Sequence, residues 1–161
     1  MISLDIHKQS VTAVAVDEAL GAEAQLFGRR TYEFLAARWP SRSGELADRL
    51  NEMPKYVVSS TPKDLDWNNS TVLAGDVVQE VSNLKNQLDG EIIVAGSIRL
   101  VRTLLENDLV DELRLMVFPV VLAAGERLFG ETSEHRPVRL VETRTVDDLA
   151  YLIYEVVREA A

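Results

Sequence analysis

The hydrophobic residues of this chain of 161 residues alternate between a helical and a strand-like period. Tyr32, Leu35, Ala36 and Trp39 recur at the spacing of one helix face, and Pro40 follows them. Apolar runs of strand length lie between segments of this kind. The pattern predicts helices at about 14–20, 32–39, 46–53, 77–88 and 100–105, and strands at 22–27, 56–58, 71–73, 91–95, 113–122, 138–146 and 149–157.

Several polar residues and prolines mark the ends of these elements. Asp76 directly precedes the helix at 77–88 and is predicted to cap it. Pro119 predicts a bend or a sheet edge, and 147–148, Asp-Asp, predicts a hairpin turn. The strand at 91–95 is so apolar that we expect no solvent-exposed face.

Strands that alternate with helices predict a largely parallel sheet, covered by helices on both faces. The last two strands predict an antiparallel hairpin at one edge. Sheets of this kind bind ligands at the carboxyl ends of their strands, so the strand-to-helix turns are the places to search for a site.

Composition narrows the function. Hydrophobic residues make up 47% and charged residues 27% of the chain, which is typical of a globular protein. We expect one domain, since no repeat or linker interrupts it. The net charge of −9 disfavours a general nucleic-acid binder. No apolar run approaches the ~20 residues of a membrane span.

Localisation and metal chemistry follow from the same composition. The start of the chain lacks the pattern of a secretory signal, so we expect a cytoplasmic protein. The absence of cysteine excludes disulfides, thiolate metal sites and cysteine nucleophiles. His7 and His135 lie far apart in polar surroundings, and we expect solvated side chains and no metal site.

The first candidate site is the turn at 27–33, Phe-Gly-Arg-Arg-Thr-Tyr-Glu, where a strand passes into a helix. Amide groups at a helix start attract phosphate, and Gly28 lets a ligand approach the backbone closely. Arg29 or Arg30 would then hold a phosphate through two hydrogen bonds. The other interpretation is a helix start, opened by Thr31, with solvated arginines. The spacing alone does not decide between them.

Two further turns have suitable chemistry. Ser59, Ser60 and Thr61 follow a buried strand and would hold a 2′-phosphate or a ribose, although an ordinary polar turn has the same composition. Gly96 and Ser97 join another buried strand directly to a helix, which is an anion-binding arrangement. The chain has neither the GxGxxG fingerprint nor a P-loop, so a dinucleotide would bind by a scheme other than the Rossmann one.

Taken in order, these turns resemble a known family. Together with the segments at 108–115, 118–122 and 127–129, they resemble the dihydrofolate reductase fold. The similarity is greatest to the reductase domain of bifunctional riboflavin biosynthesis proteins and its small stand-alone relatives, and it covers roughly residues 17–157. It implies a single α/β domain over 1–161, a three-layer α/β/α arrangement with a mixed, mostly parallel central sheet and a C-terminal antiparallel hairpin.

The resemblance also implies an NADPH-dependent reductase that transfers hydride to a small heterocyclic or carbonyl-type substrate. Carried over by position, the cofactor-binding residues are Gly28, Arg29, Arg30 and Thr31 for the phosphates, Ser59, Ser60 and Thr61 for the 2′-phosphate, and Gly96, Ser97, Ile98 and Arg99 for the pyrophosphate and nicotinamide ribose. The choice between NADPH and NADH stays open, as does the substrate.

The chain departs from the family pattern near its start. The apolar first strand is shortened or rebuilt over 1–16, and Ser-Leu-Asp is followed by Ile6 where relatives have glycine. The catalytic acid is therefore unknown. Asp17 and Glu18 are the candidates, and solvated acids of a helix start are the alternative. Relatives also often have Leu-Gly-x-Gly where this chain has alanines at 123–124, which predicts a differently shaped loop.

A second function stays open beside the reductase. The fold would survive without an active site, as a dimeric binding or interaction protein, or as a regulator that senses NADPH. A homodimer fits each case, because relatives pair through the part of the sheet at 114–122. The alternative is that Leu115, Val117, Val120 and Leu122 face the monomer's own core. We expect Trp39 and Trp67 to be packing residues.

Overall fold

The computed structural model describes residues 10–61, 65–130 and 135–158. The chain divides into two compact units, one formed by Ala15–Leu109 and the other by Met1–Val14 with Val110–Ala161, and each is described by itself. The prediction of a single domain stays a prediction. The segment 1–16 was predicted to be shortened or rebuilt. Its first nine residues, His7 among them, lie outside the described residues, and Val11–Gly21 forms a helix.

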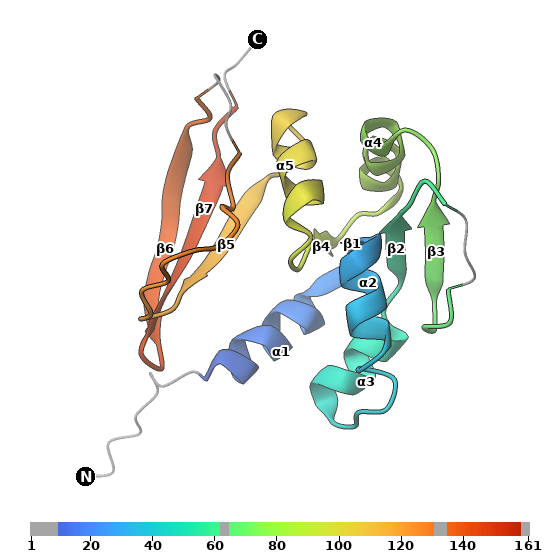
Figure 1. Cartoon of the computed structure of the whole chain (residues 1–161), viewed down its shortest axis with the longest axis horizontal. Helices are drawn as coiled ribbons and strands as arrows, with labels where there is room; N and C mark the ends of the chain where they lie inside the picture. Colours follow the sequence, from blue (N-terminus) through green and yellow to red (C-terminus); the bar gives the residue numbers. More distant parts are fainter. Residues whose placement is uncertain (1–9, 62–64, 131–134, 159–161) are drawn as a thin grey trace. The chain divides into compact units, whose positions relative to one another are not determined.

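The unit Ala15–Leu109 alternates helices and strands as the sequence predicts (Figure 1). Its elements are the larger part of α1 (Val11–Gly21), then β1 (Ala22–Gly28), α2 (Arg29–Ala36), α3 (Glu45–Glu52), β2 (Lys55–Val58), β3 (Ser70–Leu73), α4 (Val77–Gln87), β4 (Glu91–Ile93) and α5 (Ile98–Glu106). Pro54 stands one residue beyond α3, after Met53. The Asp76 carboxylate accepts a hydrogen bond from the Gln79 amide, so the predicted cap of α4 is confirmed.

The four strands of this unit form a parallel sheet in the order β3-β2-β1-β4. The chain therefore runs outward from β1 through β2 and β3 and then returns to the other side of β1. This reversal is a topological switch point, and it lies between the carboxyl ends of β1 and β4. Residues on both faces of β1 are buried, as expected for a central strand covered on two sides.

Aromatic packing fixes the end of β1 against α2. Phe27 and Val57 point to the same side of the sheet and pack with Tyr32 and Trp67, all of them 4% exposed or less. The Trp67 amide donates to the Tyr32 hydroxyl at 3.0 Å, and its ring stacks on Phe27 with centroids 6.2 Å apart. Trp67 is thus a packing residue, as predicted, and it holds α2 over the carboxyl half of the sheet.

The other unit contains an antiparallel sheet in the order β5-β7-β6, with strands β5 (Glu112–Val117), β6 (Val138–Val146) and β7 (Leu149–Val156). The predicted hairpin turn is confirmed, with Asp147 in the left-handed region at φ 50°. One face of the sheet buries Val146, Leu149 and Tyr151 against Val14.

The α/β fold class is confirmed. The expectation of one mixed central sheet with the hairpin at its edge is corrected, because the described parallel and antiparallel strands form two separate sheets. Two further expectations about strands need correction. The strand at 91–95 is shorter and lies at one end of the strand order, so its residues are exposed or half-buried. The strand at 113–122 ends at Val117, because Pro119 cannot donate to a sheet ladder. In the part of the chain that the structure describes, no helix is long and apolar enough to cross a membrane.

Candidate functional site

Two of the predicted turns meet at the switch point of the parallel sheet. The Gly28 amide, at the end of β1, donates to the Ser97 hydroxyl at 2.9 Å. A Cβ on Gly28 would lie 3.4 Å from that hydroxyl oxygen, in ordinary van der Waals contact, so the Ser97 side chain packs directly against this end of β1. Ser97 itself has φ 59° and follows Gly96 at φ 74°. As an acceptor, the Ser97 hydroxyl keeps its own proton for a further contact.

The first and second predicted turns meet on the other side of Gly28, around a small pocket. Arg29 from the first turn of α2 and Ser59 and Thr61 from the turn after β2 supply its polar groups. Its other lining residues are Tyr32, Glu33, Val57, Leu65 and Val72. The volume is about 60 Å³, far below the several hundred Å³ of a pocket that encloses a whole ligand. The pocket has room for one group of a ligand, such as a phosphate.

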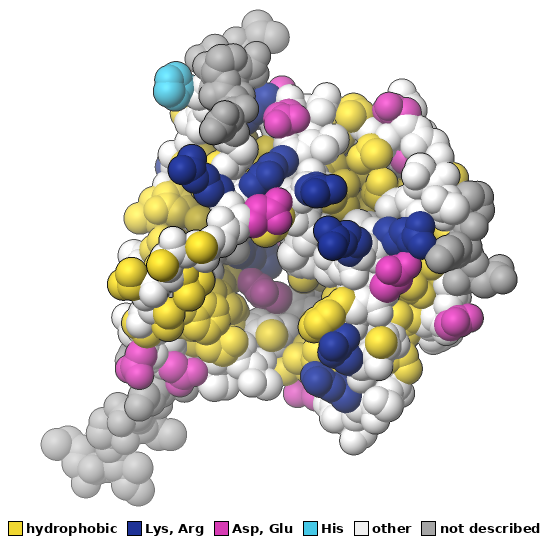
Figure 2. Space-filling model, in the orientation of Figure 1, with side chains coloured by type: hydrophobic (Ala, Val, Ile, Leu, Met, Phe, Trp, Pro, Cys, Tyr) yellow, Lys and Arg dark blue, Asp and Glu magenta, His cyan; other side chains and the backbone are white. Residues whose placement is uncertain are grey.

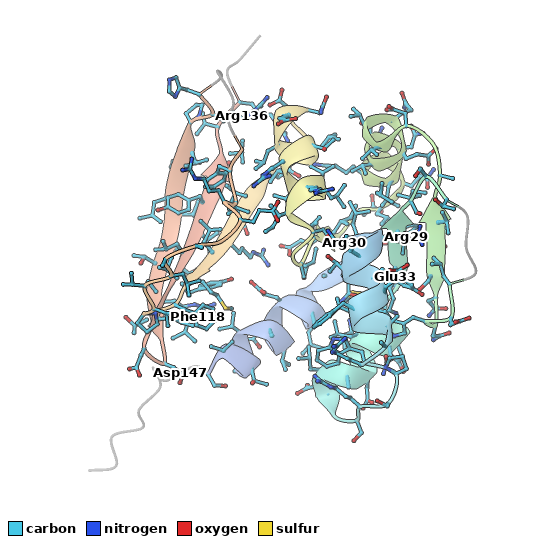
Figure 3. The ribbon with its side chains drawn as sticks, viewed as in Figure 1. Arg29, Arg30, Glu33, Phe118, Arg136 and Asp147 are labelled. Atoms are coloured by element: carbon cyan, nitrogen blue, oxygen red, sulfur yellow. The ribbon has the colours of Figure 1, made fainter. Side chains whose placement is uncertain are left out.

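An ion pair forms part of the lining of this pocket. The Arg29 Nε donates to the Glu33 Oε1 at 2.8 Å, one helical turn along α2. The two side chains are 36% and 54% exposed, so solvent screens the pair. In Figure 3, Arg29 and Glu33 lie on the same side of α2, whereas Arg30 lies on another.

The helix starts at this edge differ in how their amides are capped. Within the described chain, neither Gly28 before α2 nor Ser97 before α5 makes a side-chain cap hydrogen bond. Asp76 before α4 does make one. The first amides of a helix have no partner within the helix, so the starts of α2 and α5 offer donors to an anion while α4 supplies its own.

The structure places the remaining predicted residues as follows. Thr31 lies beside the backbone of Gly96, with its methyl carbon 3.8 Å from where a Cβ on Gly96 would stand. Four more of the predicted cofactor-binding residues are not among the lining residues of the pocket: Arg30, Ser60, Ile98 and Arg99. Asp17 and Glu18 lie in α1, which leads into the amino end of β1. Their catalytic role stays a prediction.

The pocket includes side chains that the sequence analysis did not single out as ligand-binding. Val57 and Val72 come from neighbouring parallel strands, and Leu65 comes from the segment between them. Their residue types are ordinary for a core, so only the tertiary structure shows that they form the pocket floor. Among residues 10–61, 65–130 and 135–158, no three acidic or imidazole side chains are grouped to hold a metal ion. His135 is exposed, as expected.

Comparison with known proteins decides the family. A model of the RibD C-terminal domain matches residues 3–151 of the chain. The chain belongs to this family. YyaP of Bacillus subtilis (strain 168) is 30% identical over 125 residues, which are 74% of this chain and 66% of YyaP. This RibD C-terminal domain thus spans just under two thirds of that relative.

Solved structures show the same fold. A protein of Shewanella sp. PV-4, described as a riboflavin biosynthesis protein, superposes with a TM-score of 0.74 at 20% identity, over 98% of this chain and 84% of that one. A pyrimidine reductase-like protein of Corynebacterium diphtheriae gives 0.64 at 16% identity, over 98% and 85%. The resemblance inferred from the ordered turns is therefore confirmed at the level of family and fold.

Proposed function

We propose that this RibD C-terminal domain is an NADPH-dependent reductase acting on a small heterocyclic or carbonyl-type substrate. The observation that carries the proposal is the pocket at the carboxyl edge of the parallel sheet, where an arginine and two hydroxyl residues surround an apolar floor. Family membership supports the reductase chemistry, because the family is that of a riboflavin biosynthesis reductase domain.

The donor set fits a phosphorylated dinucleotide. Arg29 and Thr61 carry donors that bind a phosphate, whereas the Ser59 hydroxyl already donates to the Thr61 carbonyl at 2.9 Å. The half-buried Leu65 and Val72 offer an apolar surface to the adenosine beside that phosphate. The uncapped starts of α2 and α5, linked through Gly28 and Ser97, supply amides for the pyrophosphate. Each group lies at the edge where parallel sheets bind ligands.

The protein's contribution to such a reaction is orientation. NADPH, when bound, supplies the hydride. The Gly28–Ser97 hydrogen bond fixes the two turns against each other, so the groups that receive the pyrophosphate keep a constant spacing. Asp17 or Glu18 would deliver the proton that the substrate needs.

Titration calorimetry with NADPH tests the binding half of the proposal. We expect micromolar binding by the wild type and a loss of at least about tenfold in the variant with both Arg29→Ala and Arg30→Ala, since charge-assisted contacts to phosphate are lost. The matched control replaces Arg38 and Arg42, two exposed arginines beyond the pocket, with alanine. Equal affinities in all three proteins would remove Arg29 and Arg30 from the site.

The catalytic half needs a turnover assay. Loss of NADPH absorbance is followed in the presence of a panel of aromatic heterocycles and carbonyl compounds. Turnover of one class by the wild type supports the reductase. Tight binding without any turnover would favour the sensing regulator, and no binding of the dinucleotide would favour the interaction protein.

We propose in addition that the protein is a homodimer. The last residue of β5 and the segment after it expose apolar side chains to an extent that is unusual for a monomer: Val117 53%, Phe118 57%, Val120 64%, Val121 100% and Leu122 78%. Figure 2 shows hydrophobic side chains gathered over the antiparallel sheet and the loop that follows β5. These exposures disfavour the alternative that Val117, Val120 and Leu122 serve the monomer's own core.

A further inference from the structure

The pocket contains a carboxylate where a phosphate would be received. Arg29 and Glu33 are the charged side chains among its described lining residues, and they are joined by the hydrogen bond of 2.8 Å. The guanidinium that would hold a phosphate is therefore already engaged by an anion. The charges of the lining residues that the structure describes sum to zero, and the protein as a whole carries −9.

The two nicotinamide dinucleotides place different groups at this position. NADPH has a 2′-phosphate, which needs cationic donors and is repelled by a carboxylate. NADH has a 2′-hydroxyl, which can donate a hydrogen bond to a carboxylate oxygen. Arg29 thus favours the first cofactor, and Glu33 favours the second.

We propose that Glu33 is the residue that sets the preference between the two dinucleotides. It engages Arg29 and presents its carboxylate to the ribose, which weakens the preference for the phosphate and allows NADH to bind as well. The inference rests on the proposed dinucleotide site. It extends that proposal, because it assigns the choice between NADPH and NADH to one side chain of α2. Glu33 was not among the cofactor-binding residues that the family resemblance implied.

The test compares affinities for NADPH and NADH in the wild type, in Glu33→Gln and in a matched control. Glutamine keeps the length of the side chain and removes its charge. Glu52→Gln removes the same charge at the exposed end of α3, which leads into the amino end of β2 and so lies away from the pocket. Thermal unfolding of each variant confirms that it is folded, which we expect because an exposed ion pair one helical turn apart contributes little to stability.

We expect Glu33→Gln to raise the ratio of NADPH affinity to NADH affinity by about fivefold or more, mainly because NADPH binds more tightly. Solvent weakens the repulsion between a carboxylate and a phosphate within a few ångströms of each other, but it does not abolish it. The control should leave the ratio unchanged. A complementary variant, Arg29→Gln, should weaken the binding of NADPH by a larger factor than the binding of NADH, because only NADPH carries the 2′-phosphate.

The outcomes separate the two proposals. Binding of the dinucleotides with the same ratio in Glu33→Gln and the wild type overturns the role of Glu33 and leaves the proposed reductase standing. An equal rise in the Glu52→Gln control assigns the effect to net charge and also overturns it. If no protein in the series binds either dinucleotide, the proposed function fails, and the assignment of Glu33 fails with it.

Discussion

At the scale of single residues, Lys55 has the least ordinary environment. Its side chain is fully buried at the start of β2. The ammonium donates to three backbone carbonyl oxygens, those of Asn51 at 3.1 Å, Met53 at 2.7 Å and Asn68 at 2.9 Å. It also lies 4.6 Å from the centre of the Trp67 ring. Three donors thus meet three acceptors, and the lysine ties the end of α3 to the segment before β3.

Replacing Lys55 by methionine should destabilise the protein by about 2–4 kcal/mol, because carbonyl groups that it satisfies lose their partner while remaining largely buried. Urea unfolding measures the change. Lys85→Met is the matched control, since its amine donates to the Leu109 carbonyl at 2.9 Å and the helix position is only half-buried. We expect a cost below about 1 kcal/mol there. Equal costs would show that the buried position of Lys55 contributes nothing special.

The pH dependence of stability tests the same residue. Burial removes water from the amine and lowers the pKa of Lys55 to about 8, from 10.5. Between these values the unfolded chain binds a proton that the folded chain does not, so this group makes the protein more stable as the pH rises from 8 toward 10.5. Below pH 8 both states are charged and the dependence vanishes.

We therefore expect the free energy of unfolding of the wild type to rise by about 1–2 kcal/mol relative to that of Lys55→Met between pH 7.5 and 9.5. Denaturant unfolding in buffers across this range measures it, and comparing the two proteins removes the titration of other groups. Parallel curves would mean that the three carbonyls hold the amine charged at every pH tested.

At the scale of elements, the edge of the parallel sheet combines one capped and two uncapped helix starts. Asp76→Ala should destabilise the protein by about 1 kcal/mol, because the Gln79 amide loses its acceptor. Asp76→Asn keeps a side-chain oxygen at the same place and should cost much less. Urea unfolding of both variants measures the difference. If the cap contributes nothing, the urea unfolding curves of both Asp76 variants will coincide with that of the wild type.

The sequence predicted the helices and strands themselves far better than it predicted which strands lie next to one another in a sheet. Hydrophobic periodicity gave β6 with its observed ends, and Pro54 gave the end of α3, because these signals depend on neighbouring residues only. The exposed position of β4 was missed, since a strand's neighbours are chosen by the whole sheet.

The candidate site shows the same division. Arg29, Ser59 and Thr61 were identified from turn chemistry, and the structure brings them to one pocket. That Arg29 is engaged by Glu33, and that Leu65 lies under the pocket, depends on tertiary packing. Residue types at a strand end therefore predict which groups gather there. Only the geometry shows that one of them, Glu33, is positioned to compete with a ligand for Arg29.

At the scale of the whole molecule, an exposed apolar surface predicts association. Besides the segment after β5, the antiparallel sheet exposes Val138 by 43%, Leu140 by 49% and Val141 by 58%. Leu140 lies on the same face as Leu115 and Val117, opposite to the face that packs on Val14. Exposed apolar side chains in such number usually mark an interface, and a second copy of the chain would cover them in a symmetric dimer.

Light scattering of the purified protein tests this association directly. We expect a mass near twice 18.0 kDa. Val121→Lys and Leu122→Lys should each give a monomer, because a lysine amine at the centre of an apolar interface loses its hydration without gaining a partner. Leu20→Lys is the control, a side chain 51% exposed near the end of α1, and it should remain a dimer. A monomeric wild type would contradict the homodimer, and dimeric Val121→Lys and Leu122→Lys variants would move the interface to another surface.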